Sequence, residues 1–217
     1  MKVHILFGAP GSGKGSLATL LEEKFDLTRI STGDILRNSV STETEIGLMV
    51  KAKMANGTLV DDDIVNEIVF ARLQDETKDV LFDGYPRTLN QAIALDDFLS
   101  EKGISFGLVV CLDVPMSVLQ DRVINRRVCS NSACGAIYHL VRNKPVVDGV
   151  CDRCGSPLEQ RSDDTPQAFK VRMDVFNASY EPVLAHYRSN TSFRQVDGLA
   201  MPDEVFNVVA KHYEECI

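Results

Sequence analysis

The sequence predicts an α/β fold built on a parallel β-sheet, and three observations support this prediction. Short apolar runs alternate with segments of helical periodicity along most of the 217 residues, as in consecutive βαβ units. The first apolar run passes directly into a glycine-rich turn, which a helical segment follows. Hydrophobic residues make up 44% of the chain, which is enough for the buried core of one sizeable domain.

The expected elements follow one another in a regular order. Apolar runs predict strands at 3–9, 28–31, 79–86, 106–115 and 192–198. Apolar residues at helical spacing predict helices at 14–25, 33–40, 41–57, 61–73, 88–103, 116–128, 163–188 and 202–216. Thr42 and Glu45 form a candidate capping box, Gly57 is a candidate helix stop, and Pro166 suits the first position of a helix.

Residues 129–160 interrupt this order. They are rich in Gly, Pro, Asn and Asp and have little helical periodicity, so we expect a small insertion of turns and short strands.

The charge and the apolar pattern exclude several functions. The net charge of −8 disfavours nucleic acid and anionic membranes as partners. No apolar run approaches the roughly 20 residues of a membrane helix, and the first apolar run is too short for a signal peptide. We therefore expect a cytoplasmic protein, in which cysteines serve as metal ligands or buried residues rather than as disulfides.

The glycine-rich turn predicts a phosphate-binding loop. Residues 8–14, GAPGSGK, match G-x-x-x-x-G-K between an apolar strand and a helix. Backbone N–H groups and the helix N-terminus would bind phosphate oxygens, and Lys14 would add a mobile charge. Gly15 replaces the usual hydroxyl residue after the lysine, and Ser16 comes next. Asp83, at the end of a second buried strand, would hold Mg²⁺ directly or through water.

Arginines occur at positions where an apolar residue is expected. Arg122 and Arg126 share one helix face, Arg87 follows the second clear strand, and Arg172 lies on a largely apolar helical stripe. Such an arginine either extends to solvent or meets an anion. The bidentate guanidinium suits phosphate, so this pattern favours phosphoryl transfer, which needs no catalytic base when the acceptor is itself an ionised phosphate.

Together these segments resemble adenylate kinase of the long-lid bacterial type. The resemblance runs nearly from end to end, through GAPGSGKGS, STGDILR, GTLVDD, FDGYPRTLNQA, DRVINRRVC, YHL, QRSDD and VDG in the family's order. It implies the P-loop nucleoside monophosphate kinase fold, with a five-stranded parallel sheet flanked by helices. The implied core covers 1–30, 61–121 and 165–217, with an inserted AMP-binding arm at 31–60 and a zinc-ribbon-like lid at 122–164.

The resemblance also implies the reaction and its residues. ATP would transfer its γ-phosphoryl group to AMP, giving two ADP, in a monomeric enzyme. The implied ATP-binding residues are Gly11, Ser12, Gly13, Lys14, Gly15, Ser16, Arg122 (stacked on the adenine) and Arg126. The implied AMP-binding residues are Thr32, Arg37, Leu59, Val60, Gly84, Arg87, Gln91, Arg161 and Arg172. The implied catalytic cations are Lys14, Arg87, Arg126, Arg161 and Arg172, with Asp163 and Asp164 anchoring the hinge of the lid and its arginines.

Three positions depart from the family's pattern. Asn125 replaces a usual glycine before the paired arginines, and Ser16 replaces a usual threonine while keeping the hydroxyl. A lysine often found after VDG is absent. The family's adenine contact there is largely through the backbone, so this last change bears only slightly on base preference.

Four cysteines fall within the implied lid. Cys151 and Cys154 have the C-x₂-C spacing of a zinc knuckle, whereas Cys129 and Cys134 have the longer C-x₄-C spacing, with Asn131 and Ser132 as a two-residue insertion. A structural Zn²⁺ would supply folding free energy that so short a segment cannot obtain from a core. Disulfides, or a former site without metal, are the alternatives. Cys111 is expected to be a buried apolar residue, and His139 is not expected to be a ligand.

Two other functions fit part of the pattern. A nucleoside monophosphate kinase using UMP or CMP as acceptor, or GTP as donor, shares the loop and the arginines, although Thr32 and the long lid favour AMP. A nucleic-acid-binding zinc ribbon with a vestigial loop fits the cysteines but not the acidic charge.

Overall fold

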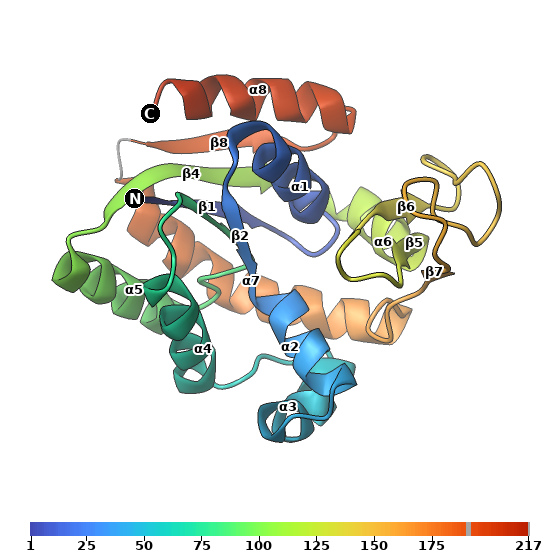
Figure 1. Ribbon diagram of the computed structural model, residues 1–217, viewed down its shortest axis with the longest axis horizontal. Coiled ribbons are helices and arrows are strands. Elements are labelled where there is room, and N and C mark those ends of the chain that lie inside the picture. The colour runs from blue at the N-terminus through green and yellow to red at the C-terminus, as the bar shows by residue number, and fades with distance from the viewer. Residues whose placement is uncertain (190–191, 217) are drawn as a thin grey trace.

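The computed structural model describes residues 1–189 and 192–216, and its centre is a five-stranded parallel sheet with the order β2-β3-β1-β4-β8. Figure 1 shows this sheet between two layers of helices. The strands are β1 (Lys2–Gly8), β2 (Thr28–Ser31), β3 (Val80–Asp83), β4 (Ser105–Asp113) and β8 (Phe193–Asp197). The predicted α/β class, the five strands and their parallel arrangement are confirmed.

Each face of the sheet is buried under its own helices. On one face, α1 (Lys14–Phe25) and α8 (Pro202–Glu214) pack through Leu21 and Val209. On the other face lie α4 (Asp62–Gln74), α5 (Leu89–Lys102) and α7 (Pro166–Arg188). Residues of β1 alternate between these two cores, as a strand buried on both faces requires. Pro166 occupies the first turn of α7 as predicted, after the capping residue Thr165.

Two short helices form an arm between β2 and α4. They are α2 (Thr32–Ser41) and α3 (Glu45–Ala55), at the lower edge of Figure 1. The predicted capping box of Thr42 and Glu45 is wrong, because α2 runs through Ser41 and the Thr42 N–H still bonds to the Asn38 carbonyl at 2.9 Å. The capping residue of α3 is Thr44, whose hydroxyl accepts from the Gly47 N–H at 3.1 Å. The predicted stop at Gly57 is confirmed by its φ of +74° just after the helix.

The segment between α6 (Met116–Ile124) and α7 is a small β-structure, which we call the cysteine insertion (residues 125–165). Its strands are β5 (Arg126–Cys129), β6 (Ile137–His139) and β7 (Leu158–Glu159), in the antiparallel order β6-β5-β7. The helix predicted at 116–128 is therefore too long, because residues 126–129 pair with neighbouring strands. Asn125 ends α6 at φ −88°, which any residue can adopt, so its replacement of a glycine causes no strain.

Among the residues that the structure describes, no helix is both long enough and apolar enough to cross a bilayer. The expected core range 165–217 includes residues 190, 191 and 217, which lie outside the described residues.

One histidine is enclosed by the core of the sheet. His4 is 1% exposed, and its Nδ1 accepts the Leu108 N–H at 2.9 Å. A Cβ on Gly107 would lie 2.3 Å from the ring, so the glycine makes room for it. Burial lowers the pKa of His4 to about 4, although Asp79 opposes this shift. The folded protein therefore holds His4 neutral, while the unfolded chain binds a proton below about pH 6.5.

We predict that this histidine weakens the fold in mild acid. As the pH falls from 6.5 towards 4, the unfolded state gains a proton that the folded state does not, so stability drops by about 1.4 kcal/mol per pH unit. The free energy of unfolding of the wild type, measured with urea, should be about 2 kcal/mol lower at pH 5 than at pH 7. In His4→Asn, where an amide oxygen can accept the Leu108 N–H, the loss should be about 2 kcal/mol smaller than in the wild type. His212→Asn, on the exposed side of α8, is the control, and an equal loss in His4→Asn and wild type would contradict the prediction.

Candidate active site

The phosphate loop lies between β1 and α1, where the sequence places it. Gly13 precedes α1 at φ +102°, and Gly11 has φ +86° with the Leu119 carbonyl 2.8 Å from where a Cβ would stand. The backbone can therefore curl tightly only because these positions are glycine. The loop places a helix N-terminus, with its unpaired N–H groups, at the carboxyl end of the sheet.

Lys14 is folded back onto this loop. Its Nζ donates to the carbonyls of Gly8 at 2.6 Å and Ala9 at 3.0 Å. Burial lowers the pKa of Lys14 to about 8; Asp83 opposes the shift, and nearby arginines add to it. An anion bound beside the lysine would favour its charged form, so phosphate binding and protonation of Lys14 would favour each other.

Two cavities lie at the carboxyl end of the sheet and share three arginines. The larger, of about 600 Å³, lies over the phosphate loop, and the smaller, of about 80 Å³, lies between the arm and the end of β3. Arg37, Arg87 and Arg172 line both. Two ligands bound in the two cavities would therefore meet at these guanidinium groups.

The nucleotide-binding residues expected from the sequence all line one of these cavities. The larger cavity is lined by Gly11, Ser12, Gly13, Lys14, Gly15, Ser16, Asp83, Arg122, Arg126 and Arg161. The smaller is lined by Thr32, Val60 and Gln91, and both are lined by Arg37, Leu59, Gly84, Arg87 and Arg172. Residues from six separate stretches of the sequence thus converge on one region.

Carboxylates hold the arginines in place. Arg126 donates from Nε to Asp164 at 2.8 Å, and Arg172 donates from Nη1 to Asp163 at 3.0 Å. Asp164 is fully buried and also lies 3.5 Å from Arg172. Through these contacts the two aspartates link the cysteine insertion to α7.

Burial and mutual repulsion weaken the charged state of other arginines here. Burial, together with neighbouring arginines, lowers the pKa of Arg161 to about 9 and that of Arg87 to about 10. A bound anion stabilises such desolvated, mutually repelling cations more than it stabilises solvated ones. The cavity therefore favours a multiply charged ligand.

Sequence reasoning missed two residues of the site, Arg29 and Asp34. Arg29 pairs with Asp83, so a cation holds the carboxylate that the sequence assigned to Mg²⁺. Asp34 pairs with Arg37 at 2.5 Å and with Arg161 at 3.4 Å. The i,i+3 spacing of Asp34 and Arg37 was a usable local signal. The partnership of Arg29 with Asp83 was not, because it joins residues 54 positions apart.

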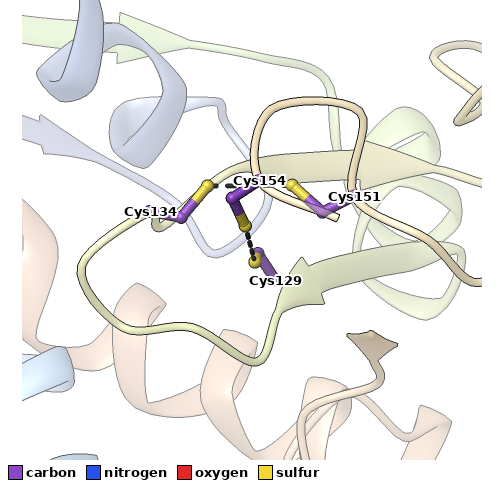
Figure 2. Close-up of side chains that lie close together, drawn as sticks. All are labelled: Cys129, Cys134, Cys151 and Cys154. Atoms are coloured by element: carbon purple, nitrogen blue, oxygen red, sulfur yellow. Dashed lines mark hydrogen bonds between the residues drawn. The ribbon is translucent and has the colours of Figure 1, made fainter. Parts of the chain in front are cut away.

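The four cysteines of the insertion form one cluster. Figure 2 shows their side chains pointing toward one another, Cys129 from the end of β5 and the other three from loops. All four Sγ atoms lie within 4.8 Å of one another, with Cys129 and Cys154 at 3.4 Å and Cys134 and Cys151 at 3.7 Å. A tetrahedral Zn²⁺ site with four thiolates has sulfur–sulfur edges of about 3.8 Å, so the donor set fits this ion. All six cysteines of the chain are free thiols, and His139 lies outside the cluster with its Nδ1 accepting two backbone N–H groups.

Hydrogen bonds within the insertion favour a thiolate. The hydroxyl and backbone N–H of Ser156 lower the pKa of Cys154 to about 6, whereas burial raises the pKa of Cys129 to about 12. The core around the cluster is small: it consists of Cys129, Ala136, Tyr138 and Cys151, with Cys134 and Leu158 packed against it. This amount of apolar burial is little for an independently folded unit.

The insertion lies against the phosphate loop and the rest of the molecule. Arg153, between two of the cysteines, pairs with Glu23 of α1 at 2.5 Å. Ile137 reaches within 3.3 Å of where a Cβ on Gly15 would stand, and Arg161 reaches Asp34 on α2. The insertion thus covers the larger cavity.

A phosphate loop after β1, an acidic residue at the end of the neighbouring β3 and converging arginines define a P-loop nucleotide phosphotransferase. Comparison with known proteins agrees. The adenylate kinase family model matches residues 6–192. Adenylate kinase of Clostridium acetobutylicum is 43% identical over 208 residues, 95% of both chains, and that of Clostridium novyi is 41% identical over 212 residues, 97% of both. The adenylate kinase of Thermoanaerobacter sp. strain X514 is 41% identical over 209 residues, 95% of both. The chain therefore belongs to the adenylate kinase family.

Proposed function

We propose that the protein catalyses the reversible, Mg²⁺-dependent transfer of the ATP γ-phosphoryl group to AMP, giving two ADP, and so balances the adenine nucleotides of the cell. The observation that carries this proposal is the meeting of the two cavities at Arg37, Arg87 and Arg172. ATP would bind over the phosphate loop, and AMP would bind in the smaller cavity. Their phosphates would then face each other across the shared arginines.

Each group of residues has a role in this proposal. The loop from Gly11 to Ser16 binds the donor phosphates, and Arg122, whose Nη1 donates to the Gly198 carbonyl at 2.9 Å, is held beside the adenine of ATP. The acceptor residues are Thr32, Arg37, Leu59, Val60, Gly84, Arg87, Gln91, Arg161 and Arg172. The cations that neutralise the transferred group are Lys14, Arg87, Arg126, Arg161 and Arg172.

The chemistry needs positioning more than proton transfer. A phosphate oxygen of AMP forms a bond to the γ-phosphorus as the bond to the bridging oxygen of ATP breaks, and ADP leaves from each side. The AMP phosphate is already ionised, so no base is required. Mg²⁺, arriving with ATP, would neutralise phosphate charge, and Asp83 would hold it directly or through water. Because the cations are partly buried, each one stabilises the charge of the transferred group more than it would in water.

The four cysteines would hold a structural Zn²⁺. In this proposal residues 122–164 form a lid, residues 31–60 an AMP-binding arm, and the remainder the core. The metal would stiffen the lid so that it moves as one body, excludes water and delivers Arg126 and Arg161. We further propose that the enzyme is a cytoplasmic monomer without nucleic-acid or membrane partners, in keeping with its acidic charge.

The first test is ADP formation from ATP and AMP, with and without Mg²⁺. Wild type should form ADP rapidly only with Mg²⁺, and Lys14→Ala should lower kcat by about 10²- to 10³-fold because a buried cation near the transferred group is lost. Lys24→Ala, an exposed lysine of the same helix, is the control. Normal turnover in a folded Lys14→Ala protein would remove this lysine from its role. Faster reaction with UMP or CMP, or with GTP, would instead indicate the alternative nucleoside monophosphate kinase.

Arg87→Ala should impair the acceptor more than the donor. Loss of charged hydrogen bonds to the AMP phosphate should raise KM for AMP by about 10- to 100-fold. The Kd of ATP, measured by calorimetry without AMP, should change far less. Arg72→Ala, an exposed arginine of α4, should change neither. An equal loss for ATP and AMP would contradict the acceptor assignment.

Metal analysis of the purified protein tests the zinc site. We expect about one Zn²⁺ per chain, and Cys151→Ser should lose it and lower Tm by about 5 °C or more, because the insertion has little apolar core. Cys216→Ser, in the C-terminal segment, should keep both metal and Tm. A native protein with free thiols and no metal would refute the site.

A further inference from the structure

Asp62 links the acceptor cavity to the start of α4 through two hydrogen bonds. Its Oδ2 accepts from the Thr88 hydroxyl at 2.7 Å. Its Oδ1 accepts from Gln91 Nε2 at 2.7 Å. None of the nucleotide-binding roles described above includes this carboxylate.

The other end of the Gln91 side chain is also fixed. Its Oε1 accepts from the Arg87 backbone N–H at 2.7 Å, and Gln91 is only 2% exposed. A carboxylate can only accept and a backbone N–H can only donate, so both contacts require the same orientation of the amide. Rotating it by half a turn would set oxygen against carboxylate and N–H against N–H. The amide is therefore held in one of its two orientations.

The fixed amide leaves a defined pattern for a ligand. Gln91 lines the smaller cavity, and each of its terminal atoms has one further site, an N–H on Nε2 and a lone pair on Oε1. Adenine presents a matching edge, since N1 accepts and the 6-amino group donates. Hypoxanthine presents the inverted edge, because its N1–H donates and its O6 accepts.

We propose that Asp62 is a positioning residue that fixes the amide orientation of Gln91 and thereby makes the acceptor site prefer 6-aminopurines over 6-oxopurines. This rests on the proposed function, in which the smaller cavity holds the acceptor nucleotide. Asp62 acts only through Gln91 and does not touch the base. A hydroxyl or amide mismatch in a buried site is rejected strongly, because both groups are left unpaired.

The decisive measurement is the ratio of kcat/KM for AMP to kcat/KM for IMP. In Asp62→Asn the new side chain can offer either oxygen or N–H to Gln91, so position 62 no longer selects one amide orientation and only the Arg87 N–H still does. We expect the ratio to fall by about tenfold or more, with the rate on IMP rising relative to that on AMP. Asp62→Ala removes the carboxylate that accepts from Nε2, leaves the Arg87 N–H as the remaining orienting contact, and should shift the ratio in the same direction. Asp63→Asn, the same charge change at the exposed neighbouring residue, should leave it unchanged.

The ratio separates positioning from simple loss of structure, because a smaller folded fraction lowers both rates equally. An AMP-to-IMP ratio within about twofold of wild type in both folded Asp62 variants would overturn the proposal.

If the variants fail to fold, the wild-type enzyme can be tested with a series of different acceptors instead. Purine riboside 5′-monophosphate has the N1 acceptor but no 6-substituent, so it lacks one bond without presenting a clash. The expected order is AMP, then purine riboside monophosphate, then IMP. IMP used as well as purine riboside monophosphate would overturn the proposal. Failure of the wild type to use AMP at all would instead refute the proposed function, and this inference with it.

Discussion

Repulsion among partly buried cations is the constraint on which the rest of the structure depends. In the part of the chain that is described, nine cationic side chains and three carboxylates line the larger cavity, although the whole protein carries a net charge of −8. Such a cluster is costly without anions. Asp163 and Asp164 neutralise part of it, and Asp34 and Asp83 do so on the opposite side. A polyphosphate supplies the charge that these four carboxylates leave unbalanced, which explains why the residues can gather here.

The fold brings these charges together through the ends of its strands. The phosphate loop follows β1, Asp83 ends β3, and Thr32 begins the helix after β2, so all three lie at the carboxyl edge of the parallel sheet. This edge is where parallel α/β sheets bind ligands. The cysteine insertion then covers it from the far side, pairing Arg153 with Glu23 and Arg161 with Asp34. The four cysteines line neither cavity, so a metal held by them would contribute to the shape and stiffness of this cover.

Features written in local sequence could be predicted, and features that depend on distant pairing could not. The phosphate loop, the five strands and the cysteine cluster follow from short motifs and periodicity. The predicted helix over 116–128 extends too far, because the apolar and basic residues 126–129 suit either a helix or a strand. Only their pairing with β6 and β7 makes them a strand. Thr42 and Thr44 were equally good caps on sequence alone. Arg29 and Asp62 contact residues 54 and 29 positions away in the sequence, and no residue near them in the sequence indicates these partners.

The most direct test of the convergent cation cluster is a crystal structure with a bisubstrate analogue that joins ATP and AMP through their phosphates. The phosphates of the donor half should lie in the loop from Gly8 to Lys14. Oxygens at the junction should lie within hydrogen-bond distance of Arg87, Arg126, Arg161 and Arg172. A phosphate chain bound away from the loop, or one that these arginines do not approach with the insertion closed, would contradict the central claim.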